Sequence, residues 1–183
     1  SIKLKEKMDP EKMLAREHEQ LALLWEGLDR LPNLTILADK HRTNRLSIIS
    51  FYIEGLHYNL GVKMLNDKFG IQTRGGCSCA GTYGHYLLAL DENLSAEIEQ
   101  QVLSGDCSLR PGWIRLSIHP TTTDKEIRYI VGAITALHNN FQGWTSEYRV
   151  NYSTNTIEPK NKEADIHLKN HMENLFDLGI TVN

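Results

Sequence analysis

Apolar side chains recur along most of this chain with the period of a helix. In residues 10–31 five leucines lie three, four or seven positions apart, and similar spacing returns in 60–69, 95–103 and 127–141. Such spacing places the apolar side chains on one side of a helix, so we expect an amphipathic helix in each range. A further amphipathic helix is expected over 162–177, close to the end of the chain.

Shorter apolar runs separate the expected helices. They cover residues 34–38, 45–53, 71–74 and 112–119. Runs of this length, bounded by polar residues, glycine or proline, are typical of strands. A few strands mixed with helices predict an α+β fold, with a three- to four-stranded, mainly antiparallel sheet and helices packed on one face. Residues 142–160 show no clear period, and we expect a loop or an edge extension there.

Several helix ends are marked by residues that favour them. Pro10 suits the first turn of a helix, where its missing N–H would have no partner in any case. Asn59 is expected to cap the helix that begins at the next residue, and Gly70 to end it. Thr123 and Glu126 have the spacing of a capping box, in which each side chain bonds the backbone of the other residue.

The composition restricts the classes of function. The chain has 183 residues, of which 40% are hydrophobic and 23% charged, which suits one folded domain with an extension. Its net charge of -3 and pI of about 6.2 argue against nucleic-acid or anionic-membrane partners, which need a concentrated basic face. No apolar run approaches the roughly 20 residues of a membrane span, and no signal peptide is visible. Three cysteines indicate a reducing, cytoplasmic location rather than a disulfide framework.

The densest candidate chemistry lies in residues 72–80, QTRGGCSCA, which contain two of the three cysteines. Cys77 and Cys79 are one residue apart, whereas zinc sites use a wider cysteine spacing and need a second pair of ligands. We therefore expect no metal site. A C-x-x-C redox motif is also absent from the sequence. The pattern leaves two interpretations: a reactive thiol, or two small residues in a tight turn.

The residues around the cysteines favour a reactive thiol. Arg74 supplies a positive charge close by in the sequence. Gly75 and Gly76 allow unusual backbone angles and the close approach of a ligand. A helix is expected to begin within residues 82–88. A cation and a helix N-terminus both stabilise a thiolate relative to the thiol.

A second candidate lies in the strand expected over residues 112–119, GWIRLSIH. Alternation places Trp113, Arg115 and Ser117 on one face, opposite the apolar side chains that would enter the core. Arg115 then points away from the core. It is either an exposed arginine or a guanidinium fork that binds a substrate carboxylate through two hydrogen bonds.

These segments occur in an order that resembles a known family. REHEQLALLWEGLDRLPNLTIL is followed by RLSIISFYIEGLHYNLGVKMLNDKFGIQTRGGCSCA and then by IRLSIHPTTTDKEIRYIVGAI. Over about residues 10–138, the set resembles the C-terminal small domain of class V aminotransferases. These are fold-type I pyridoxal-phosphate enzymes, and they include cysteine desulfurases and selenocysteine lyases.

The resemblance implies roles for particular residues. The family's loop reads Arg-Thr-Gly-x-x-Cys-Ala, and counting from Arg74 puts its reactive cysteine at Cys79. Cys79 would accept sulfur from a cofactor-bound substrate as a persulfide. Arg115 matches the strand arginine that binds the carboxylate of the amino-acid substrate, with Arg74 as its neighbour. His119 matches a polar turn before the last helix of the family domain. The implied substrate is a small amino acid such as cysteine.

The chain also departs from the family pattern. Gly75 replaces the usual threonine of the loop, and Cys77 and Ser78 occupy positions that are often histidine in the desulfurases. Residues 91–110 resemble an insertion. These departures weaken assignment as a desulfurase more than assignment to the family, because other members transaminate, epimerise or eliminate without a cysteine nucleophile.

The parts of the family that hold the cofactor are not recognisable in the sequence. We find no Schiff-base lysine in a Ser/Thr-x-His-Lys-like context, no phosphate cradle and no aspartate for the pyridinium nitrogen. We therefore expect residues 1–141 to be the small domain and 142–183 a C-terminal extension ending in a helix. Pyridoxal phosphate would be bound by a large domain outside this chain. The chain alone is then expected to be inactive, and the full-length enzyme to be a homodimer. The alternative is a non-catalytic α+β interaction domain whose first helix docks on a partner.

Overall fold

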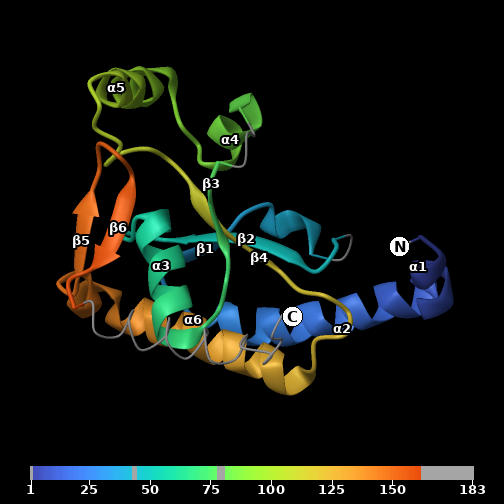
Figure 1. Cartoon of the computed structure of the whole chain (residues 1–183). Coiled ribbons are helices and arrows are strands. Elements are labelled where there is room, and N and C mark those ends of the chain that lie inside the picture. The colour runs from blue at the N-terminus through green and yellow to red at the C-terminus, as the bar shows by residue number, and fades with distance from the viewer. Residues whose placement is uncertain (1, 43–44, 78–80, 162–183) are drawn as a thin grey trace, which may run out of the picture.

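The computed structural model describes residues 2–42, 45–77 and 81–161, and shows a small sheet, the helices around it and a separate hairpin (Figure 1). The helices are α1 (Ile2–Met8), α2 (Pro10–Leu28), α3 (Tyr58–Phe69), α4 (Gly81–Leu87), α5 (Glu92–Leu103) and α6 (Asp124–Thr145), with a short 3-10 helix at Asp39–His41. The strands are β1 (Leu34–Ile36), β2 (Ile48–Ile53), β3 (Arg74–Gly76), β4 (Trp113–Ser117), β5 (Tyr148–Asn151) and β6 (Thr156–Pro159).

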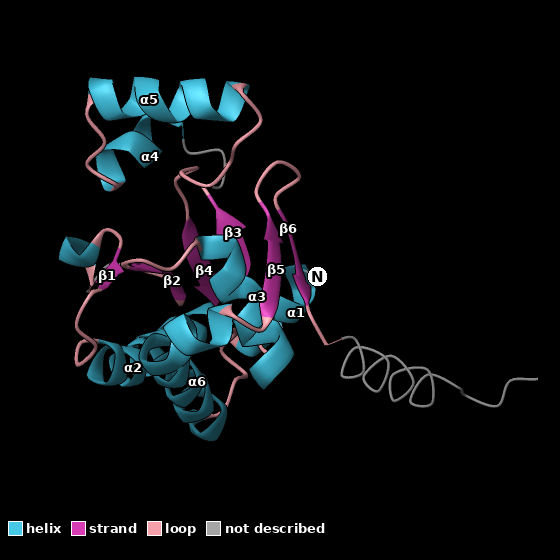
Figure 2. Cartoon of the chain, turned by 90° about the vertical axis from the view of Figure 1, so that its left-hand side faces the viewer, coloured by secondary structure: helices cyan, strands magenta, loops and turns pink. Residues whose placement is uncertain are grey.

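The main sheet has the strand order β1-β2-β4-β3, and each neighbouring pair is antiparallel. Helices α2, α3 and α6 cover one face of this sheet, whereas α4 and α5 lie on its other side (Figures 1 and 2). The predicted α+β fold with a small, mainly antiparallel sheet is therefore confirmed.

The core lies between the sheet and helices α2, α3 and α6. In β2, Ile49, Phe51 and Ile53 are buried while the residues between them are more exposed. This alternation is expected for a strand with one covered face. The apolar core cluster consists of Leu21, Leu24, Leu28, Ile36, Ile49, Phe51, Ile53, Leu56, Tyr58, Leu60, Met64, Leu65, Ile114, Leu116, Ile118, Ile127, Ala133, Ile134, Leu137 and Tyr148.

Most of the predicted helix ends are confirmed. α2 begins at Pro10, after Asp9, whose carboxylate accepts hydrogen bonds from the backbone of the first turn. Thr123 and Glu126 form the predicted capping box of α6, in which the backbone N–H of Thr123 donates to Oε2 of Glu126 over 2.7 Å. Gly70 ends α3 in the left-handed conformation, with a φ of 66°.

Two boundaries near α3 differ from the prediction. His57, rather than Asn59, is the N-cap residue, and the Asn59 amide instead donates to Oδ1 of Asn155 over 2.7 Å. The third predicted strand begins only at Arg74. The N–H of Ile71 closes the last turn of α3 by bonding a helix carbonyl, so it is not available to the sheet.

Residues 142–160 are not a loop. α6 continues to Thr145, so the expected domain boundary after residue 141 falls inside this helix. β5 and β6 then form an antiparallel hairpin that contacts α3, and Tyr148 at its base is part of the buried core. Strands this short show too little alternation to be recognised in a sequence. The helix predicted over 162–177 lies outside the described residues.

Candidate functional site

Arg74 and Arg115 are direct neighbours across strands β3 and β4. Their Cα atoms are register partners in the antiparallel pair, and Ser50 of β2 is the partner of Arg115 on its other side. Side chains at directly opposed positions leave a sheet on the same face, with Cβ atoms about 4.5–5.5 Å apart. The two guanidinium groups therefore share the face that looks away from α2, α3 and α6.

Within residues 2–42, 45–77 and 81–161, neither arginine has a counter-charge. No ion pair in these ranges includes Arg74 or Arg115, and Nε of Arg115 is buried without a hydrogen-bond partner. Like charges that face each other across a sheet repel, and a buried donor without an acceptor is unfavourable. An anion that accepts hydrogen bonds from both guanidinium groups would relieve both penalties. This pair is the candidate functional site.

The two glycines beside Arg74 are present for different structural reasons. A Cβ on Gly75 would lie 2.9 Å from Cδ2 of Tyr58 and 3.0 Å from Oδ1 of Asn59, because α3 packs against this position. The lack of a side chain at Gly75 is therefore explained by the packing of α3, and the approach of a ligand to its exposed backbone stays a prediction. Gly76 has a φ of 113°, which confirms the unusual backbone angle predicted for this turn. Since Gly75 faces α3, the adjacent Arg74 faces the opposite side of the sheet.

Cys77 does not have the surroundings of an activated thiol. Its Sγ lies 2.8 Å from the carbonyl oxygen of Pro111, to which the thiol donates. Burial raises the pKa of Cys77 above its ordinary value, and the charge of the nearby Arg110 opposes this only in part. The protonated thiol is therefore favoured at neutral pH. Cys79, the predicted sulfur acceptor, lies outside the described residues.

His119 lies further along the face that carries Arg115. Ile118 is buried and His119 is exposed, so the alternation of β4 continues past its last residue. Four residues of extended chain place His119 about 13 Å from Arg115. His119 is therefore not a direct neighbour of the arginine pair. Of the predicted site residues, the fold brings Arg74 and Arg115 together and leaves His119 at the far end of the strand.

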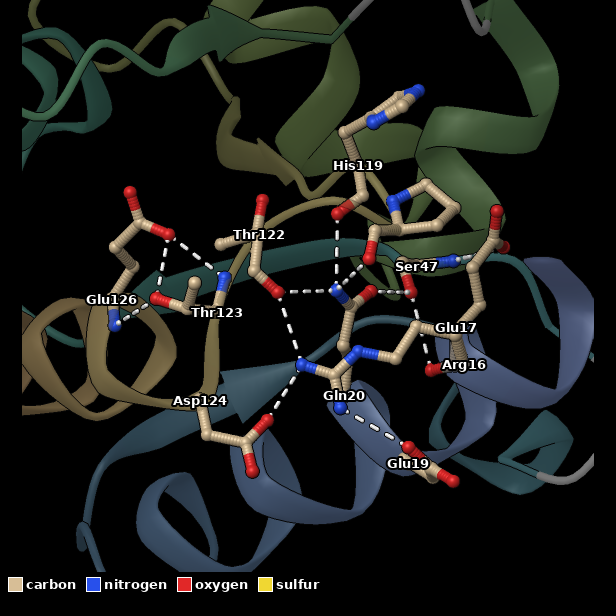
Figure 3. A network of polar contacts seen from close by, with 11 residues as sticks. Arg16, Glu17, Glu19, Gln20, Ser47, His119, Thr122, Thr123, Asp124 and Glu126 are labelled. Atoms are coloured by element: carbon tan, nitrogen blue, oxygen red, sulfur yellow. Dashed lines mark hydrogen bonds and ion pairs between the residues drawn. The ribbon is translucent and has the colours of Figure 1, made fainter. Parts of the chain in front are cut away.

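Gln20, which the sequence interpretation overlooked, holds the turn that contains His119 (Figure 3). Gln20 belongs to α2 and is fully buried. Its Nε2 lies 2.9–3.2 Å from the carbonyl oxygens of His119, Pro120 and Thr122. A signal for this role was present in the sequence, because Gln20 precedes Leu24 by one helical turn on the apolar stripe. A polar residue at such a position needs a partner.

The groove beside the hairpin does not fit pyridoxal phosphate. A groove of about 460 Å³ lies between α3, the segment before β3 and the hairpin, and it is lined by Lys63 and by side-chain carboxamides. Nζ of Lys63 is 2.9 Å from Oδ1 of Asp67, so this lysine is held in an ion pair. The cofactor needs a lysine that can form a Schiff base and a cradle for its phosphate, and this groove provides neither.

Two further kinds of function are not indicated by the described part of the chain. No cluster of histidine, cysteine, aspartate or glutamate side chains within it has the arrangement needed to hold a metal ion. None of its helices is long and apolar enough to cross a membrane.

Comparison with known proteins places this architecture in a family. The Aminotransferase class-V family model matches residues 1–130. The apo structure of a cysteine desulfurase from Thermococcus onnurineus NA1 has a TM-score of 0.58 and 21% identity, covering 76% of this chain and 29% of that chain. The cysteine desulfurase CsdA from Escherichia coli has a TM-score of 0.45 and 20% identity, covering 68% of this chain and 25% of that chain. No curated protein matches the chain.

The two kinds of match support different statements. At 21% identity, the likeness to the Thermococcus desulfurase shows a shared fold, and this chain spans only 29% of that protein. The family match is broader, because it covers well over half of this chain and includes both Arg74 and Arg115. The chain belongs to the class V aminotransferase family, whose enzymes depend on pyridoxal phosphate.

Proposed function

We propose that this chain supplies the substrate-carboxylate site of a pyridoxal-phosphate-dependent enzyme that acts on a small amino acid. The observation that carries the proposal is the directly opposed pair Arg74 and Arg115, which has no counter-charge in the described part of the chain. The cofactor would be held by the large domain of the enzyme, and this chain alone would be inactive. The full-length enzyme would be a cytoplasmic homodimer.

The geometry of the pair suits a carboxylate. Each guanidinium group is a planar fork of N–H donors, so the two oxygens of one carboxylate can accept from different arginines. Arg115 is half-buried, which partly shields its charge-assisted hydrogen bonds from water and strengthens them. Ser50, the other register partner of Arg115, places a hydroxyl on the same face of the sheet.

Within this class of enzyme, we propose a reaction of the cysteine desulfurase type with Cys79 as the sulfur acceptor. The support is the place of Cys79 in the family's loop and the desulfurase fold. Cys77 does not compete for this role, because its thiol donates to Pro111 and burial raises its pKa. In the full-length enzyme, Cys79→Ala should abolish sulfur release from L-cysteine. Full retention of activity would favour aminotransfer or another lyase reaction.

The carboxylate site is tested by titrating the 183-residue chain with acetate and with L-alanine. NMR signals of the arginine Nε–H groups report which side chains respond. The signals of Arg74 and Arg115 should shift together and saturate, and Arg115→Met should weaken binding at least tenfold, which corresponds to about 1.4 kcal/mol. Arg149→Ala is the matched control, because Arg149 is exposed on β5 and lies opposite Glu158. Weak shifts of equal size at all arginines, without saturation, would overturn the proposal.

A second function is favoured by the exposure of α1. None of its residues is buried, and the side chains of Ile2 and Leu4 are 74% and 63% exposed. A non-catalytic α+β interaction domain was expected to dock through the helix over residues 10–31, which is α2, but the apolar stripe of α2 is buried in the core. The unpredicted and exposed α1 is therefore the helix that such a domain would use to dock on a partner. Supplying the large domain of a class V aminotransferase in trans separates the two functions. Restored turnover supports part of an enzyme, whereas association without turnover supports an interaction domain.

A further inference from the structure

One buried side chain holds the turn that follows β4 (Figure 3). Nε2 of Gln20 lies 3.0 Å from the carbonyl oxygen of His119, 3.2 Å from that of Pro120 and 2.9 Å from that of Thr122. A carboxamide nitrogen has two hydrogens. Three carbonyl groups therefore share two donors of a side chain that is 0% exposed, while the hydrogen bonds themselves are partly buried.

The turn is closed by its own backbone hydrogen bond, from the N–H of Thr122 to the carbonyl oxygen of His119, and Gln20 adds a donor at its centre. Carbonyl oxygens that converge on one point repel each other, and removing their shared donor from a partly buried place is unfavourable. Two of the three carbonyl oxygens have a second donor: that of Thr122 accepts from Nη2 of Arg16 over 3.0 Å, and that of His119 accepts from the backbone N–H of Thr122 over 2.9 Å. Within the described residues, the carbonyl oxygen of Pro120 accepts from Gln20 alone. On its other side, Oε1 of Gln20 faces the Ser47 hydroxyl at 3.4 Å. The donors of Gln20 thus belong to the turn, and its acceptor belongs to the start of the neighbouring strand.

The contacts within the turn determine the tautomer of the His119 ring. The backbone N–H of Thr121 lies 3.3 Å from Nδ1 of His119, and the Thr121 hydroxyl lies 2.8 Å from the same nitrogen. A backbone N–H can only donate, so Nδ1 is the acceptor and the proton of the neutral ring is on Nε2. Figure 3 shows the ring directed away from Gln20 and α2. Nε2–H is therefore an outward hydrogen-bond donor.

We propose that Gln20 is a positioning residue of the site: its carboxamide holds the turn 119–122 so that His119 presents Nε2–H as a donor on the face that carries Arg115. This inference rests on the proposed function, in which the two arginines bind a carboxylate. His119 would add a hydrogen-bond donor at the far end of the same face. Gln20 acts through the turn and does not touch the ligand.

The test measures the ¹⁵N shifts of the His119 ring in the 183-residue chain at a pH where the ring is neutral. In the wild-type chain, Nδ1 should have the shift of an unprotonated ring nitrogen. In Gln20→Leu, its shift should move toward the value averaged over both tautomers. The matched control is Ser47→Ala, which removes the hydroxyl that faces Oε1 of Gln20 but leaves the donors to the turn intact. Ser47→Ala should keep the wild-type shift even where it lowers the melting temperature.

The outcomes separate positioning from stability. An unchanged Nδ1 shift in Gln20→Leu, or an equal change in Ser47→Ala, would overturn the positioning role. If Gln20→Leu does not fold, Gln20→Asn carries the same test, because it keeps the carboxamide but withdraws it by one methylene. Acetate titration of the same samples tests the proposed function separately. If acetate does not shift the NMR signals of Arg74 and Arg115, the carboxylate site is rejected. If the Nδ1 shift of His119 still changes in Gln20→Leu, the positioning role of Gln20 is supported.

Discussion

Replacing Arg74 with alanine should stabilise the free chain at low ionic strength, because the substitution removes the repulsion between two opposed guanidinium groups. For charges about 6 Å apart, Coulomb's law gives about 0.7 kcal/mol in water and about 2.8 kcal/mol at an effective dielectric constant of 20. Arg74 is exposed and Arg115 is half-buried, so solvent screening keeps the energy near the lower value. We expect a gain of about 0.5–1 kcal/mol in the free energy of unfolding.

Thermal unfolding at low salt and at about 1 M NaCl measures this effect. In a domain of this size, the gain corresponds to a rise in melting temperature of about 1–4 °C. The rise should disappear at about 1 M salt, where the Debye length is about 3 Å. Arg149→Ala is the matched control, because Arg149 faces Glu158 across the hairpin and its removal loses an attraction instead of a repulsion. Saturating acetate should raise the melting temperature of the wild-type chain by more than it raises that of the Arg74→Ala variant.

The sign of the change decides the question. A fall in melting temperature for Arg74→Ala at low salt, as in Arg149→Ala, would mean that the two guanidinium groups do not repel each other. A rise that persists at high salt would show that charge is not its cause. Either result would refute the reasoning that Arg74 and Arg115 repel each other in the absence of a counter-charge.

Two further predictions concern the elements around the site. Gly75→Ala should lower the free energy of unfolding by about 1–3 kcal/mol, because the added methyl group would overpack α3. Gly132→Ala, where nothing lies within 4 Å, should raise it by up to about 1 kcal/mol, and equal urea midpoints for the two variants would contradict the packing argument. The backbone N–H of Thr123, followed by its hydroxyl, lowers the pKa of Glu126 below its ordinary value. The contribution of Glu126 to stability is therefore complete above its unfolded-state pKa of about 4.3 and is lost as the pH falls through the lowered value. Melting temperatures of the wild-type chain and Glu126→Ala should differ at pH 7 and converge in acid, and a difference that persists near pH 2 would count against this account.

The sequence allowed most of the helical layer to be predicted. The stripes of α2 and α6 and the capping box at Thr123 are repeated local patterns, and local hydrogen bonds produce them directly. The alternation in β4 likewise placed Ile114 and Leu116 on the core side correctly. From that alternation, the sequence also predicted that Arg115 points away from the core.

Features that depend on distant contacts were missed or misplaced. β3 starts later than predicted because Ile71 is used to close α3. The space beside Gly75 is taken by Tyr58, a residue whose approach no local pattern reveals. Gln20 was overlooked because its partners, the carbonyl groups of residues 119–122, lie about a hundred positions away in the chain.

The sequence by itself determined the family resemblance, the amphipathic helices and the face of β4 on which Arg115 would lie. These follow from residue identity and from periods of two and 3.6, which are properties of neighbouring residues. Only the tertiary structure decided that Arg74 lies opposite Arg115 and that Gln20 supports the turn of His119. Strand register and helix docking are set by packing between segments far apart in the chain, and a single sequence carries no local signal for them.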